Sequence, residues 1–86
     1  MSVGGKVCAV RCLRNDEGSR PGLICVNTYD GHDYCAIHLD ANYPVVVGDK
    51  LWWQGAYAYW TGALRGFEDK RIRRVGYSHK FCGVQP

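Results

Sequence analysis

The chain has 86 residues, of which 47% are hydrophobic and 22% charged, and its formal net charge is +3. This length predicts one small domain over residues 1–86 and excludes a second lobe, while the composition excludes a disordered chain. The positive charge is local, because residues 65–80 hold six of the eleven basic residues against two acidic ones, and the other seventy residues carry a net −1 (5 − 6).

The first predicted strand is Lys6–Leu13, which is apolar on both sides except at Arg11, a pattern typical of a central strand. The turn-forming segment Asn15–Gly22 follows as a surface loop. Alternation along the strand places Val7, Ala9 and Leu13 on one side and Cys8, Val10 and Cys12 on the other. The apolar run before Arg11 is too short for a signal peptide or a membrane span, so the sequence predicts a cytoplasmic protein with no membrane association.

The next two strands, Leu23–Tyr29 and His32–Leu39, flank Asp30-Gly31. This dipeptide is a strong signal for a two-residue hairpin turn, because both central positions of such a turn need positive φ. The turn would set the register of the hairpin. It predicts a core face on which Val26 pairs with Cys35 and Ile24 pairs with Ile37.

The segment Val45–Gly62 is a second hairpin, and it holds all three tryptophans of the chain. Val45–Val47 is expected to be a short buried strand that Gly48-Asp49 kinks into the hairpin, and Gly55-Ala56 is expected to be its turn. With Gln54 opposite Tyr57, one face is wholly apolar and carries Leu51, Trp53, Ala58 and Trp60. The other carries polar-tipped aromatic rings among Lys50, Trp52, Gln54, Tyr57, Tyr59 and Thr61. A three-residue turn would mix the two faces, so the pattern favours this register.

After Gly62 the sequence predicts a loop or a single helical turn, then a last strand over Arg71–Tyr77 and a tail anchored by Phe81. Five or six short, mainly antiparallel strands with frequent turns indicate a single all-β domain, either an SH3-like or OB-like barrel or a curled sheet. Its predicted core consists of Val7, Val10, Ile24, Val26, Ile37, Val46, Leu51, Trp53 and Trp60.

Two sets of side chains are candidate binding residues. Flat rings on one sheet face can stack on bases, and they equally suit the centre of a protein interface. The aromatic set is Lys50, Trp52, Gln54, Tyr57 and Tyr59, and the basic set is Arg65, Lys70, Arg71, Arg73 and Arg74. Arg71 and Arg73 share one side of the last strand, whereas Lys70 and Arg74 share the other. Two structural alternatives stay open: another segment covers the rings, or the charges only protect an edge strand.

The cysteines and histidines do not have the spacing of a metal site. Cys35-x2-His38 is the nearest approach, but structural zinc sites usually have two close ligand pairs, so no metal and no cofactor are expected. No nucleophile motif surrounds a cysteine, and the sequence predicts a non-enzymatic protein. Five cysteines is an odd number, and without an export signal all five are expected to be free thiols.

Two segments, GDKLWWQGAYAYWT and RIRRVGYS, resemble parts of short uncharacterised proteins encoded by tailed bacteriophages and prophages. Together they cover about a quarter of the chain. The resemblance implies a bacterial host cytoplasm as the setting, and it carries no activity with it.

The leading functional hypothesis is non-enzymatic binding of single-stranded nucleic acid, with bases on the rings and phosphates on the basic strand. The alternative is a small inhibitor or adaptor that presents the same rings to a host protein, with a homodimer as a further option. The first hypothesis requires the last strand to lie beside the hairpin. Sequence alone does not place these two segments relative to one another.

Overall fold

The computed structural model describes residues 2–12, 22–62 and 66–78, and these residues form one antiparallel sheet with no helix among them. The all-β prediction is therefore confirmed. The described residues form seven strands, where five or six were expected: β1 (Val3–Cys12), β2 (Leu23–Tyr29), β3 (Tyr34–Asp40), β4 (Lys50–Gln54), β5 (Tyr57–Gly62), β6 (Phe67–Arg73) and β7 (Gly76–Ser78). Their order across the sheet is β6-β5-β4-β1-β2-β3-β7.

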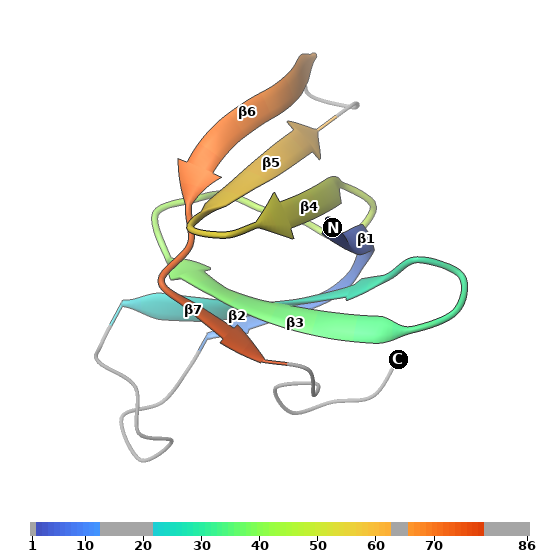
Figure 1. Cartoon of the computed structure of the whole chain (residues 1–86). Helices are drawn as coiled ribbons and strands as arrows, with labels where there is room; N and C mark the ends of the chain where they lie inside the picture. The colour runs from blue at the N-terminus through green and yellow to red at the C-terminus, as the bar shows by residue number, and fades with distance from the viewer. Residues whose placement is uncertain (1, 13–21, 63–65, 79–86) are drawn as a thin grey trace.

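The sheet curls into two layers, with β4, β5 and β6 above and β1, β2, β3 and β7 below (Figure 1). Strand β1 belongs to both layers, because Val3–Lys6 pairs with β4 and the rest of the strand pairs with β2. Gly4 allows the bend between them. Its φ is +128°, and a Cβ there would overlap the carbonyl oxygen of Leu51, so only glycine fits.

The two edges of the sheet are joined by the chain itself, since only Arg74 and Val75 separate β6 at one edge from β7 at the other. The Arg74 N–H donates to the carbonyl of Ala56 in the β4–β5 turn, and the Val75 N–H donates to the carbonyl of His38 on β3. These bonds bring the edges together and give the curled sheet its barrel-like shape (Figure 1). The single last strand expected over Arg71–Tyr77 is therefore wrong, because the chain changes edge after Arg73. The loop or helical turn expected before it is wrong at residues 67–70, which belong to β6.

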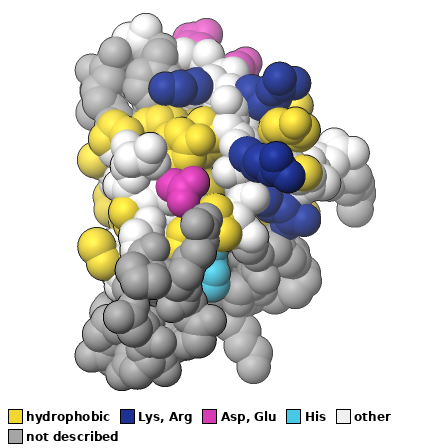
Figure 2. Space-filling model, turned by 90° about the vertical axis from the view of Figure 1, so that its left-hand side faces the viewer, with side chains coloured by type: hydrophobic (Ala, Val, Ile, Leu, Met, Phe, Trp, Pro, Cys, Tyr) yellow, Lys and Arg dark blue, Asp and Glu magenta, His cyan; other side chains and the backbone are white. Residues whose placement is uncertain are grey.

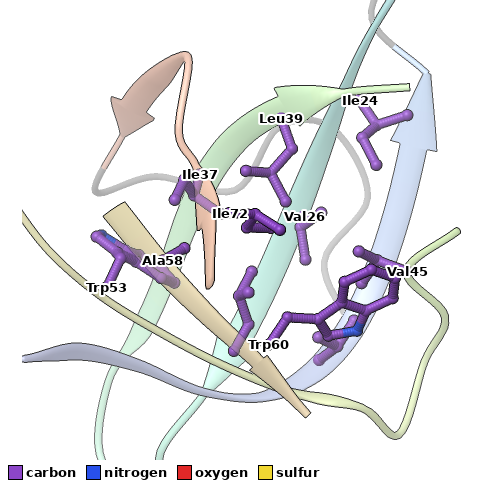
Figure 3. Close-up of a cluster of buried hydrophobic side chains, with 11 residues drawn as sticks. Ile24, Val26, Ile37, Leu39, Val45, Trp53, Ala58, Trp60 and Ile72 are labelled. Atoms are coloured by element: carbon purple, nitrogen blue, oxygen red, sulfur yellow. The ribbon is translucent and has the colours of Figure 1, made fainter. Parts of the chain in front are cut away.

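The core lies between the two layers, where side chains from both point toward one another (Figure 3). It consists of Val7, Ile24, Val26, Ile37, Leu39, Val45, Leu51, Trp53, Ala58, Trp60 and Ile72. Val10 packs against it from a partly buried position, and Val46 was wrongly predicted, because it is 48% exposed. Residues 45–47 form no strand. The Asp49 carboxylate instead holds a turn, accepting from the Val46 N–H at 3.2 Å and from the buried Trp60 indole N–H at 2.8 Å.

The β4–β5 hairpin has the register expected from sequence, from Lys50 opposite Thr61 to Gln54 opposite Tyr57. The β2–β3 hairpin does not: Val26 pairs with Ile37, two residues beyond the predicted partner. The cause is a four-residue loop in which the Asp30 carboxylate accepts from the His32 and Asp33 N–H groups, each at 2.8 Å. A shift of two residues keeps the same side chains on the core face.

The side assignment predicted for the first strand is also wrong, because β1 contains a bulge between Val7 and Ala9. The bulge reverses the alternation, so Val7 and Val10 both face the core. The predicted loop over residues 15–21 and the tail anchored by Phe81 lie outside the described residues. Among the residues that the structure describes, there is no helix of the length and apolarity needed to cross a membrane.

Candidate functional site

The outer face of β4 and β5 carries the predicted aromatic set, and it is open to solvent. Trp52 and Tyr57 are each 41% exposed and Tyr59 is 43% exposed, while Lys50 and Gln54 are exposed beside them. Among residues 2–12, 22–62 and 66–78, no segment covers the rings. Strand alternation separates this face from the buried Trp53 and Trp60, as expected.

Neighbouring strands explain why Trp52 stays accessible. On β5 its cross-strand partner is Tyr59, and on β1 its partner is Gly4, which has no side chain to lie over the indole. The Trp52 side chain, 41% exposed, is accessible to a flat ligand.

The basic strand lies directly beside this face, because β6 pairs with β5. Arg71 is opposite Tyr59, and Arg73 is opposite Tyr57. The guanidinium carbon of Arg71 is 4.8 Å from the centre of the Tyr57 ring, within the range of a cation–π contact. Figure 2 shows basic side chains close together at the right of the view, with hydrophobic side chains between and beside them, and a further basic side chain that lies apart from them. We name the combined surface the basic–aromatic face; it consists of Lys50, Trp52, Gln54, Tyr57, Tyr59, Arg71 and Arg73.

Of the other predicted basic residues, Lys70 and Arg74 do not join this face. Lys70 is opposite the buried Trp60, and its Nζ lies 5.8 Å from that ring, on the other side of β6 from Arg71. Arg74 lies beyond the end of β6 and is half-buried in the link to β7. Arg65 lies outside the described residues. Toward the start of β6 the charge becomes negative at Asp69, whose carboxylate accepts a hydrogen bond from the Thr61 hydroxyl at 3.3 Å.

Sequence reasoning missed one neighbour of the face, Lys6. It is exposed and lies directly opposite Lys50 where β1 meets β4. Sequence spacing holds no signal for this pairing, since 43 residues separate the two lysines and the bend in β1 brings them together.

The state of the described cysteines differs from the prediction. Cys25 is fully buried and disulfide-bonded, so the expectation of five free thiols is wrong. An odd cysteine count excludes only a complete set of disulfides. Cys8, Cys12 and Cys35 are free thiols. Disulfides persist in oxidising compartments, so the cysteines do not indicate that the protein lies in a reducing compartment.

Burial raises the pKa of the Cys8 thiol, and burial together with the charges of Asp30 and Asp33 raises the pKa of the Cys35 thiol. Both thiols are therefore poor nucleophiles at neutral pH. Across residues 2–12, 22–62 and 66–78, no three His, Cys, Asp or Glu side chains come together as a metal site requires. No pocket was found in that part of the chain either. The candidate site is accordingly an open surface.

Comparison of the chain with models of protein families, with curated proteins and with solved structures found no match.

Proposed function

We propose that this protein binds single-stranded nucleic acid on the basic–aromatic face and catalyses no reaction. One observation carries the proposal: Arg71 and Arg73 lie on the same sheet face as three exposed rings and directly opposite two of them. Proteins that bind single strands combine stacking rings with a charged track for the phosphates in this way. On this face, Trp52 and Tyr59 would stack on bases while the two arginines contact the backbone.

The charge and shape of the molecule favour a single strand over a duplex. A net charge of +3 gives few contacts with the dense phosphates of double-stranded DNA. The described residues include no helix that could enter a major groove. A convex sheet face with exposed rings can instead reach bases only when these are unpaired.

The test is titration with labelled oligonucleotides of DNA and RNA at several salt concentrations, read by anisotropy and by tryptophan emission. Stacking should quench Trp52, whereas Trp53 and Trp60 are buried and report no direct contact. Trp52→Ala should weaken binding by about 1–3 kcal/mol with no change in the salt slope. Arg71→Ala and Arg73→Ala should each flatten that slope by about 0.7.

Lys70→Ala is the matched control for the arginines, since it removes one charge from the other side of β6. It removes only the Lys70 contact with the Trp60 ring and should change binding far less than Arg71→Ala. If neither DNA nor RNA binds at low salt and micromolar protein, the proposal fails.

The second candidate is a protein-binding module, and a different observation favours it. Val46 and Val47, in the loop before β4, are 48% and 62% exposed, and such aliphatic side chains suit a protein partner better than a base. A protein interface centred on aromatic rings should survive moderate salt. Binding that resists salt and nuclease, to a defined host protein or to a second copy of the chain, would favour this candidate.

A further inference from the structure

A row of exposed side chains continues the basic–aromatic face across the bend in the sheet. Lys50 on β4 is opposite Lys6 on β1, Lys6 is opposite Tyr29 on β2, and Tyr29 is opposite Tyr34 on β3. All four side chains are exposed. Lys50 lies two residues before Trp52 on the same side of β4, so the row begins within the candidate site.

The pairing of Lys6 with Lys50 is unfavourable in the free protein. Two like charges directly opposite one another on neighbouring strands destabilise a sheet. Within the described part of the chain, neither lysine makes an ion pair or a hydrogen bond through its side chain that would offset this repulsion. An anion bound between the two ammonium groups would remove the repulsion, and a phosphate of a nucleic-acid backbone has suitable charge and size.

The tyrosines at the far end of the row form a preformed stack. Their ring centroids are 4.4 Å apart with 29° between the planes, and Tyr29 and Tyr34 are 38% and 42% exposed. The Tyr29 hydroxyl donates to the carbonyl of Gly31 at 3.0 Å, which fixes its ring. Asp30 and Asp33 lie in the adjoining turn, and their charge makes this end of the row suitable for a base and unsuitable for a phosphate.

We infer that the bound strand extends past Trp52, places a phosphate between Lys50 and Lys6, and stacks a base on the Tyr29–Tyr34 pair. This inference rests on the proposed function and adds a second binding subsite to it. On a flat sheet the Cα atoms of Trp52 and Tyr29 would be about 12 Å apart, from two strand spacings of about 4.8 Å and one two-residue step of about 6.6 Å. That span is short enough for one oligonucleotide to occupy both ends.

The residues at the opposite end of the row limit the path of the bound nucleic-acid strand. Beyond Lys50 the row reaches Thr61 on β5, whose hydroxyl and the Asp69 carboxylate lie close together. This carboxylate repels a phosphate, so the strand cannot continue along the row toward β6. It would therefore run from the arginines over Tyr59 and Trp52 and then turn along the two lysines toward Tyr29.

The experiment measures the affinity of the full chain for a labelled oligothymidine series from dT3 to dT12 by anisotropy. With the second subsite, affinity should rise steeply once the oligonucleotide spans both ends. Lys6→Gln and Tyr29→Ala should each weaken binding of dT12 by about five-fold or more and leave binding of dT3 within about two-fold. Lys70→Gln, a matched loss of charge on the other side of β6, should not affect the length dependence.

The outcomes separate this inference from the proposed function. If oligothymidines bind but Lys6→Gln and Tyr29→Ala bind dT12 like the wild type, the second subsite is absent and the proposed function stands. If no oligonucleotide of any length binds, both are overturned. Circular dichroism of each variant shows whether it folds, and Tyr29→Phe, which keeps the ring, should retain most of the dT12 affinity.

Discussion

The two faces of the β4–β5 hairpin have similar aromatic content but different surroundings. Trp53 and Trp60 are 2% and 1% exposed and pack in the core, whereas Trp52, the neighbour of Trp53, is 41% exposed beside Gly4. Strand alternation decides which tryptophan is buried, and the curl of the sheet covers only one face. The inner rings therefore stabilise the fold, and the outer rings are free to bind.

Two aspartates make the same contrast on a smaller scale. Asp49 is 4% exposed and accepts from one backbone N–H and from the indole N–H of Trp60. Asp30 is exposed and accepts from two backbone N–H groups of its own turn. Both carboxylates organise a turn, but only Asp49 is tied to a core side chain, so their replacement should differ in cost.

The largest expected effect separates the two adjacent tryptophans. Trp53→Ala should lower the free energy of unfolding by about 3–5 kcal/mol, because it leaves a large cavity between the layers. Trp52→Ala should lower it by about 1 kcal/mol or less, mainly through the lost pairing with Tyr59. Urea denaturation followed by circular dichroism measures both. A loss for Trp52→Ala as large as that for Trp53→Ala would mean that the outer ring is part of the core.

The next effect concerns the buried carboxylate. Asp49→Ala should destabilise the fold by about 1–3 kcal/mol, because it leaves the Trp60 indole N–H buried without its acceptor. A double-mutant cycle with Trp60→Phe isolates this contact, since phenylalanine has no N–H to leave unsatisfied. Asp49→Ala should cost less in the Trp60→Phe background. Equal costs in both backgrounds would show that the hydrogen bond contributes nothing.

The sequence was sufficient for the β4–β5 hairpin because two local signals agree there: a two-residue turn at Gly55, whose φ is +63°, and a clean separation of apolar and polar faces. In the β2–β3 hairpin the apolar pattern predicts the faces, but the turn signal predicts the wrong loop length. The side chain of Asp30 stabilises a four-residue loop that the Asp-Gly pattern does not reveal. The faces were therefore predicted correctly and the partners were not.

The arrangement of the candidate site was less predictable than its residues. The aromatic set follows from alternation in one hairpin, but the contact between Arg71 and Tyr57 requires β6 to pair with β5. The chain divides into β6 and β7 because these strands pair at opposite edges of the sheet, which depends on how the whole sheet curls. The pairing of Lys6 with Lys50 depends on a bend in β1 that only the partner strands define. None of these leaves a local pattern in the sequence.

The smallest expected effect is on the exposed carboxylate and depends on pH. Hydrogen bonds from the Asp33 and His32 N–H groups lower the pKa of Asp30 from its usual 3.8. A lowered pKa means that the folded chain binds this proton less readily than the unfolded chain, so the stabilisation is complete well above pH 3.8 and is lost as the pH falls below it. Asp30→Asn has no carboxylate to titrate, so its stability relative to the wild type should be constant near neutral pH and should rise in acid. Urea midpoints of both proteins between pH 7 and pH 2.5 measure the difference.

Because this turn adjoins the Tyr29–Tyr34 stack, near-ultraviolet circular dichroism of the wild type should change over the same acidic range. A constant difference in stability throughout would show that the carboxylate does not hold the turn.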